Sequence, residues 1–236
     1  MSSGSALIAE DVISRTRRTT TGAQNLEVHT AASILRDNYL ASHVERAEQV
    51  ILWPRGLTLK EFKDIGAQKI PLPIYQQIDQ LFFNFGLNTE FLVAGVDSTG
   101  GHLAWVHYHG VQGQGWLESF DKLGYNAIGS GGIHASILLS LTGQHRDLSI
   151  AETVFNVCAA KVNAEVAPGV GNQTDLTVIT KDGINFMSQN AVNQLRELHR
   201  KTAERIVPLA EVEKILAQEA ERKTHEQSTS SPGRTT

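Results

Sequence analysis

Two stretches decide the fold of this chain: Phe91-Leu-Val-Ala-Gly-Val-Asp97 and Tyr125-Asn-Ala-Ile-Gly-Ser-Gly-Gly132. The first is an apolar run with the length of a buried β-strand. The second predicts a short strand, then a turn whose glycines permit positive φ angles, then the start of a helix. Together they predict a sheet that delivers a glycine turn to the N-terminus of a helix.

The segments on either side complete an α+β pattern. Hairpins are expected where 98–101 joins strands at 90–97 and 102–109, and where Asp182-Gly183 joins strands at 174–181 and 184–187. Further strands are expected at 115–120 and 125–128, and helices at 23–50, 74–83, 132–141, from Ser149 onward, 189–204 and 209–221. This order favours helices layered on a mainly antiparallel sheet.

The composition is that of an ordinary globular protein. The chain has 236 residues, of which 41% are hydrophobic and 19% charged, so it can bury a core. Its net charge of −4 gives no reason to expect a nucleic acid or an anionic membrane as partner. The single cysteine, Cys158, excludes an internal disulfide and is interpreted as a buried structural thiol. Because there is neither a membrane-length apolar run nor a signal peptide, the expected location is the cytoplasm.

Four parts are expected along the chain. Residues 1–22 are polar and basic and are expected to form an N-terminal segment of low order. Residues 23–205 are expected to form the α+β domain, residues 206–224 a C-terminal helix, and residues 225–236 a disordered tail.

The Gly129-Ser-Gly-Gly132 turn is the first candidate site. The free N–H groups and the dipole of a helix N-terminus favour an anion or an oxyanion there, and Ser130 sits at this position. A tight turn that merely needs glycine is the alternative interpretation. A phosphate-binding loop is disfavoured, because no Lys-Ser or Lys-Thr pair follows.

The order of these segments resembles proteasome β-type subunits and, more closely, the bacterial proteasome-like proteins of the N-terminal nucleophile hydrolase superfamily. The resemblance is specific over residues 90–180 and extends loosely to 22–36 and to 53–62. It implies a four-layer αββα sandwich and a threonine-type peptidase or amidase, in which an N-terminal threonine attacks the amide and its own amine acts as base. It also implies a homo-oligomer or ring assembly, with a peptide as substrate if the protein is active.

The first strands of that family, which carry the nucleophile, an aspartate and a lysine, have no evident counterpart here. Only 22 residues precede the first long helix, too few for a pair of hairpins. Two substitutes are the nucleophile candidates: Ser2, which removal of Met1 would expose, and Thr19, in the run Thr19-Thr-Thr-Gly22. The catalytic residues therefore stay unknown.

The same resemblance assigns three residues to positions beside the site. Ser130 and Gly131 match the family's glycine turn, whose serine lies close to the amine of the nucleophile. Glu165 matches a family aspartate, whereas Pro168 stands where the family has a serine. The hydrogen-bond network around the amine is therefore in doubt.

Histidines offer a further candidate. His107 and His109 are expected to share one face of a strand and could bind a metal together with His102 or Asp97. Histidines on a solvated strand face are more often without function, and no cysteine or glutamate ligand is evidently placed beside them. We therefore expect no metal and no cofactor.

Three functions remain open from the sequence. The chain is interpreted first as a proteasome-like protein that is inactive, or a fragment, as it stands. The alternatives are a noncatalytic assembly protein, whose exposed sheet face needs a partner, and a small-ligand binder that uses the helix mouth at 129–132.

Overall fold

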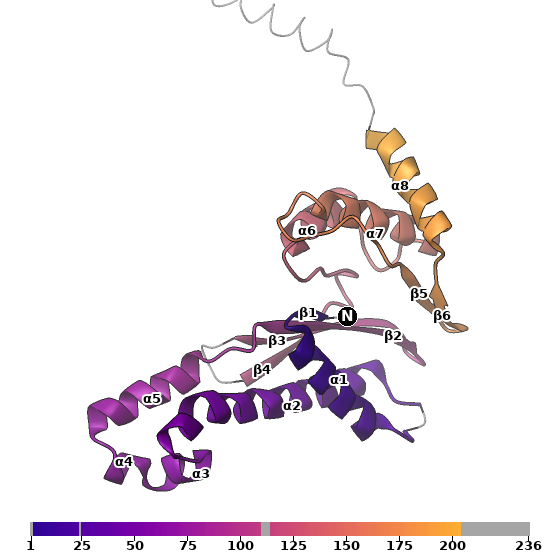
Figure 1. Ribbon diagram of the computed structural model, residues 1–236. Coiled ribbons are helices and arrows are strands. Elements are labelled where there is room, and N and C mark those ends of the chain that lie inside the picture. Colours follow the sequence, from indigo (N-terminus) through magenta and orange to yellow (C-terminus); the bar gives the residue numbers. More distant parts are fainter. Residues whose placement is uncertain (1, 24, 110–113, 204–236) are drawn as a thin grey trace, which may run out of the picture. The chain divides into compact units, whose positions relative to one another are not determined.

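The computed structural model describes residues 2–23, 25–109 and 114–203, which form an α+β fold (Figure 1). The chain divides into two units, Met1–Arg196 and Glu197–Thr236, and the fold described below is that of the first unit. The predicted helix at 209–221, the part 206–224 that contains it, and the tail at 225–236 lie outside the described residues. No helix of the described residues is long and apolar enough to cross a membrane.

Most of the predicted elements are present near their expected bounds, and two regions differ most from the prediction. In chain order they are β1 (Ser2–Gly4), α1 (Ala6–Thr20), α2 (Val28–Ala47), α3 (Leu59–Glu61), α4 (Ala67–Lys69), α5 (Leu72–Asn84), β2 (Thr89–Asp97), β3 (Gly100–His109), β4 (Gln114–Ser119), α6 (Gly132–Leu141), α7 (Ile150–Ala164), β5 (Thr177–Thr180), β6 (Gly183–Phe186) and α8 (Gln189–Ala203). The first exception is 125–128, predicted as a strand but found as irregular chain. There the Asn126 side chain accepts the N–H of Ala127, which gives this backbone group a partner outside any sheet.

The second exception is the N-terminal segment, which is ordered where little order was predicted. Strand β1 pairs antiparallel with β2, so that Ser2 lies opposite Phe91. Helix α1 follows and buries Ala9 and Val12. This apolar face is narrow and lies among polar and basic residues, so the helix was not predicted from the sequence. Strand β1 therefore forms one edge of a sheet with the order β1-β2-β3-β4.

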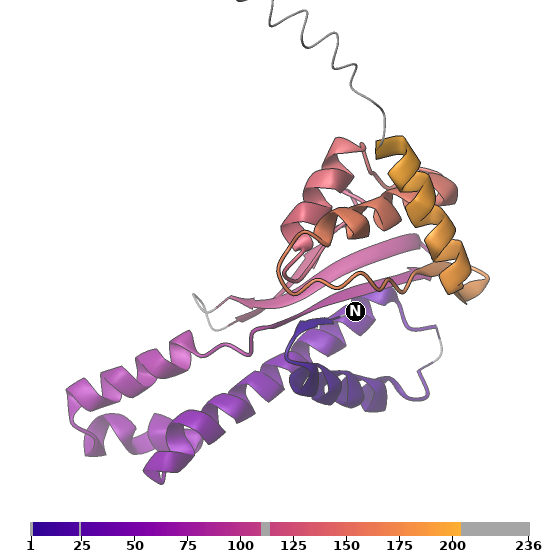
Figure 2. The ribbon, with the colours of Figure 1, turned by 45° about the horizontal axis from the view of Figure 1, so that its top comes forward.

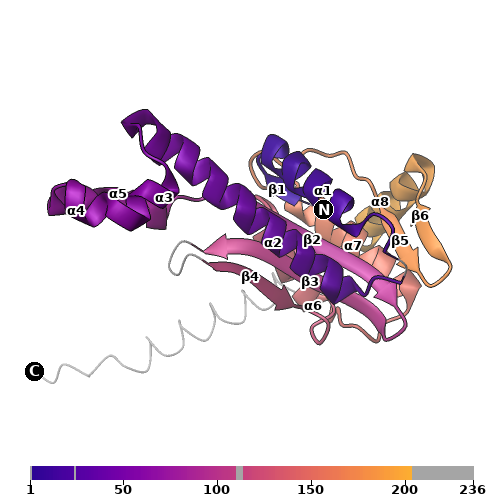
Figure 3. The same cartoon turned by 90° about the horizontal axis from the view of Figure 1, so that it is seen from below.

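Helices α1 and α2 cover one face of this antiparallel sheet, with α2 lying along it (Figure 3). The core between them contains Val12 of α1, Tyr39 of α2, and Phe91 and Val106 of the sheet. The Tyr39 hydroxyl donates to the carbonyl of Thr89 at 2.6 Å, and burial raises the pKa of Tyr39 to about 12. This contact fixes α2 on the sheet.

A helical extension between α2 and β2 has a core of its own. Ile51, Leu52, Phe62 and Ile78 are buried together there. The spacing Thr58-Leu-Lys-Glu61 predicts a capping box, and both of its reciprocal hydrogen bonds are present at the start of α3.

The opposite face of the sheet faces helices α6 and α7 (Figure 2). Glu90 connects the two layers, because its carboxylate accepts the N–H of Gly129 at 2.9 Å and the indole N–H of Trp105 at 3.1 Å. Among the described residues, the only other β-sheet is the two-stranded β5–β6 hairpin. The α+β class is therefore confirmed, whereas a four-layer sandwich would need a larger second sheet.

Candidate functional site

A pocket of about 660 Å³ lies between the four-stranded sheet and helices α6 and α7. Its wall is mainly apolar and includes Leu92, Leu103, Ala135, Leu139, Val157, Ala160, Ala164 and Leu176. The remaining wall comes from the 124–132 segment, from Ser3 of β1 and from the segment at 169–176. Its size and apolar character are those of a small-molecule site.

The glycine turn at one side of the pocket is fixed by its neighbours. Gly129 has a φ of +86°, and the N–H of Gly129 is held by Glu90. A Cβ at Gly129 would lie 3.0 Å from Oγ of Ser3, and a Cβ at Gly131 would lie 2.8 Å from Cβ of Ala164. Larger residues would therefore push the turn away from β1 and α7.

One polar group of the pocket wall has no partner. The side-chain nitrogen Nδ2 of Asn126 is buried and makes no hydrogen bond within the described residues. Its orientation is settled by the other end of the amide, because Oδ1 accepts the N–H of Ala127 at 2.8 Å. An unpaired buried donor costs about 1–3 kcal/mol, so a rearrangement of the wall that uncovers Nδ2 to a ligand oxygen would recover part of that free energy.

One further side-chain donor lies near Asn126 in the chain. Ser130 is exposed and lines the pocket. Helix α6 begins after Gly131, but Ile133 and His134 of its first turn are not among the residues that line the pocket. The N–H of Gly132 is already used by the carbonyl of Gly129, at 2.9 Å. This part of the wall therefore offers donors to an oxygen-bearing group.

Helix α7 supplies the opposite wall and an ion-pair cluster behind it. Lys161 lines the pocket, and its ammonium group donates to Glu165 at 2.9 Å and to the carbonyl of Gly171 at 2.7 Å. Arg196 binds Glu165 with two hydrogen bonds of 2.6 and 2.9 Å. The Arg196 guanidinium and, secondarily, Lys161 hold the pKa of Glu165 at about 2. These contacts fasten α8 and the 169–171 loop to α7.

The only cysteine also lines the pocket. Cys158 is 1% exposed, and burial raises the pKa of its thiol. A thiol with a raised pKa is a poor nucleophile, which agrees with the structural role predicted for it.

The structure brings together some of the predicted site residues and separates others. Ser130 and Gly131 line the pocket, whereas Glu165 stands behind the wall in its ion pairs. Ser2 lies in β1, and its side chain is outside the described part. Thr19 is exposed in the last turn of α1, where its hydroxyl donates to the carbonyl of Arg15.

Two pocket residues were missed by sequence reasoning. Ser3 and Asn126 come from segments more than a hundred residues apart, and no local pattern links them. Asn126 lies inside the stretch that predicts the glycine turn, but its unpaired amide depends on tertiary packing.

The predicted grouping of histidines is wrong. His102 and His107 are five residues apart on β3, so their side chains point to opposite faces of the sheet. His107 stacks on Trp105 with 3.7 Å between ring centroids and contacts Glu118 at 3.1 Å, although no glutamate was expected beside it. The side chain of His109 lies outside the described residues.

No family model and no curated protein matches the sequence, which overturns the membership in the bacterial proteasome-like branch inferred from the motifs. Among solved structures, the chain is similar to a mutant of Anbu from Hyphomicrobium sp. strain MC1. The two share 14% sequence identity over 87% of this chain and 78% of that one, with a TM-score of 0.45. This similarity is weak and assigns no function.

Proposed function

We propose that this chain is a noncatalytic binding protein whose pocket takes a compact apolar molecule that carries a carboxylate. The observation that carries the proposal is the unpaired Asn126 amide in the wall of a largely apolar pocket of about 660 Å³. Pockets of this kind bury most of a small ligand, and a few polar groups orient it.

The polar part of the wall favours an anionic oxygen over a cation. Asn126 Nδ2 is a donor in this wall, and the Ser130 hydroxyl can donate as well. The α6 dipole adds a partial positive charge at the same place. A carboxylate oxygen can accept a hydrogen bond from each of these two side chains.

The hydrogen bonds of the two serines in the pocket wall, Ser3 and Ser130, bear on whether either could act as a nucleophile. A serine nucleophile needs a base within hydrogen-bond reach. In the described part of the chain, no histidine, lysine or carboxylate is hydrogen-bonded to the hydroxyl of Ser3 or Ser130. This supports a binding role for the pocket rather than peptide cleavage.

Calorimetric titration with linear carboxylates of about six to twelve carbons tests the proposal. We expect saturable binding that tightens with each added methylene by about 0.8 kcal/mol until the pocket is full. Val157→Trp should weaken binding at least about tenfold, because Val157 lines the pocket and is partly exposed. Ile150→Trp, on an exposed position of the same helix outside the pocket wall, is the matched control.

Absence of saturable binding across the series would contradict the proposal, and so would equal binding by wild type and Val157→Trp. A fluorogenic peptide and a threonine-directed electrophile test the noncatalytic part separately. We expect neither turnover nor adduct. Turnover that disappears in Ser2→Ala or Thr19→Ala would show that the chain is a hydrolase after all.

Self-association is a second candidate, favoured by one surface of α6. Ile133, Ile137 and Leu141 are 75%, 52% and 78% exposed, and their four-residue spacing places them on one stripe. We propose that a second copy covers this stripe. Light scattering after size exclusion should then show a dimer that Ile137→Glu dissociates. A monomer at every concentration would refute it. The four-layer sandwich likewise stays a prediction.

A further inference from the structure

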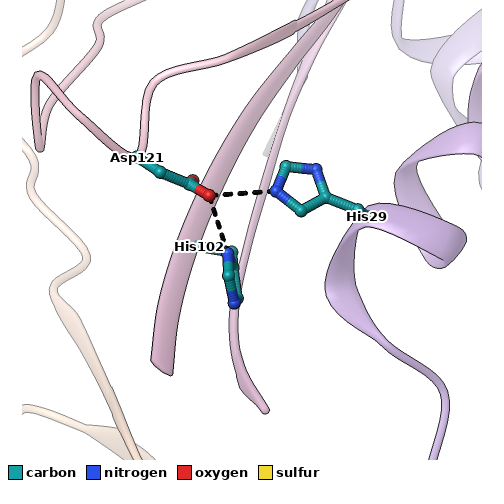
Figure 4. A group of neighbouring side chains, drawn as sticks. All are labelled: His29, His102 and Asp121. Carbon is teal, nitrogen blue, oxygen red and sulfur yellow. Dashed lines mark hydrogen bonds and ion pairs between the residues drawn. The ribbon is translucent and has the colours of Figure 1, made fainter. Parts of the chain in front are cut away.

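A cluster of two histidines and an aspartate lies on the face of the sheet opposite the pocket. His29 comes from the first turn of α2, His102 from the start of β3, and Asp121 from the chain just after β4 (Figure 4). Oδ2 of Asp121 is 2.9 Å from Nε2 of His29 and 2.7 Å from Nδ1 of His102. His29 is 92 residues from Asp121 in the sequence, so the packing of α2 on the sheet brings it to the other two residues.

The three atoms have the types and the spacing of metal ligands. All lie within 4.8 Å of one another. Zinc binds imidazole nitrogen and carboxylate oxygen at about 2.0–2.2 Å, so tetrahedral ligands are about 3.3 Å apart. The two measured distances are about half an ångström shorter than that. Small side-chain rotations would therefore open the cluster enough for an ion.

The surroundings orient the ligands as in known metal sites. Oδ1 of Asp121 accepts the N–H of Leu103 at 2.8 Å, which leaves Oδ2 for the cluster. Nε2 of His102, the nitrogen not facing Asp121, lies 3.1 Å from Oδ1 of Asp97 and 2.7 Å from the hydroxyl of Thr99. A metal-binding histidine commonly donates its second N–H to a carboxylate in this way, which fixes its tautomer and ring orientation.

Exposure of the cluster leaves room for a further ligand. The side chain of His29 is 42% exposed, whereas those of His102 and Asp121 are 13% and 19% exposed. Three protein ligands with an accessible fourth position are typical of zinc sites that bind water or a substrate. Histidine and carboxylate together suit zinc better than calcium or magnesium, which prefer oxygen ligands alone.

We propose that His29 Nε2, His102 Nδ1 and Asp121 Oδ2 bind a zinc ion, which fastens the N-terminus of α2 to the β3–β4 edge and keeps one coordination position open to solvent. The competing state is a hydrogen-bond cluster without metal, in which both imidazoles donate to the same carboxylate oxygen. The site is separate from the pocket, and the proposal does not depend on the ligand proposed there.

Zinc titration of the untagged, chelator-stripped full chain against a zinc-responsive dye tests the proposal. We expect one equivalent of zinc to bind with a dissociation constant of about 1 µM or less. His29→Gln and Asp121→Asn should each weaken binding at least about tenfold. His145→Gln, at an exposed histidine outside the cluster, should bind as the wild type does. Cobalt in place of zinc should give the visible absorption bands of a four-coordinate ion, and these should be lost in His29→Gln.

An unfolding curve of each variant, measured in the presence of chelator, checks that the variant is folded without metal. Asp121→Asn keeps an oxygen that can accept the Leu103 N–H, and His29 is partly exposed, so both variants should unfold cooperatively. If Asp121→Asn does not fold, His29→Gln decides the question. Zinc binding that is equal in wild type and His29→Gln would overturn the proposal. So would the absence of stoichiometric binding, which would leave a hydrogen-bond cluster only.

Discussion

Glu165→Gln should destabilise the protein without directly weakening ligand binding. The pKa of Glu165 is about 2 against an ordinary value of 4.5, chiefly because Arg196 donates two hydrogen bonds to its carboxylate. That difference corresponds to at most about 3 kcal/mol of folding free energy. The Glu165 and Arg196 side chains are 18% and 25% exposed, so solvent screens part of it. We expect a loss of about 1–2 kcal/mol at pH 7.

The stability difference between wild type and Glu165→Gln should depend on pH in a defined direction. A carboxyl group whose pKa is lowered by folding contributes stability that is fully present above its unfolded pKa and is lost as the pH falls through its folded pKa. The difference between wild type and Glu165→Gln should therefore be constant above about pH 4.5 and should shrink toward zero near pH 2. Urea unfolding at several pH values measures it.

Glu197→Gln is the matched control. Glu197 forms an exposed pair with Arg200 within α8, and solvent screens such pairs, so we expect little change in stability. Carboxylate affinity of Glu165→Gln at pH 7 should stay within about twofold of wild type, because Glu165 does not line the pocket. A Glu165→Gln protein of unchanged stability would refute the structural role of this cluster. If Glu165→Gln were stable but no longer bound the carboxylate, Glu165 would contribute to ligand binding.

Three further predictions concern the core and the pocket. Tyr39→Phe should lower the free energy of unfolding by about 1–2 kcal/mol, measured in urea, because the carbonyl of Thr89 loses a buried donor. Gly131→Ala should cost about 1–3 kcal/mol, measured in the same way, because its Cβ would lie 2.8 Å from Cβ of Ala164. Cys158 should react with a disulfide reagent far more slowly in the folded protein than in denaturant, and a bound carboxylate should slow it further.

Each of these has a result that would count against it. Gly101→Ala is the control for the glycine prediction, because a Cβ there would meet nothing within 4 Å. Equal losses at Gly101 and Gly131 would mean that the close approach to α7 is not what matters. A Tyr39→Phe protein as stable as the wild type would contradict the claim that the hydrogen bond from Tyr39 to Thr89 fixes α2 on the sheet. Rapid labelling of Cys158 in the folded protein would contradict its burial.

Local patterns were enough to predict most of the helices and strands. The capping box predicted at Thr58 and the N-cap predicted at Ser149 are both present in the structure. The β2–β3 hairpin likewise follows from two apolar runs and a glycine-containing turn. Helix α1 was missed because its buried face is only a few residues wide among basic and hydroxyl side chains.

The sites could be predicted only in part, because they depend on contacts between distant segments. The glycine turn before a helix start is a local feature and was predicted, whereas the pocket that Ser130 lines is formed by distant segments. The contact between His29 and Asp121 joins residues 92 positions apart, and no spacing rule foretells it. The histidine prediction grouped residues of strand β3 with one another. It did not include α2, which packs against the face of β3 that carries His102.

The central claim is that the pocket binds a carboxylate through Asn126. The side-chain amide signals of Asn126 in a nitrogen-15 correlation spectrum report this most directly, because Nδ2 has no partner before binding. We predict that titration with a linear carboxylate of about ten carbons shifts these signals saturably, with the affinity found by calorimetry. Unmoved Asn126 signals at saturation, with shifts confined to residues outside the pocket, would contradict the claim.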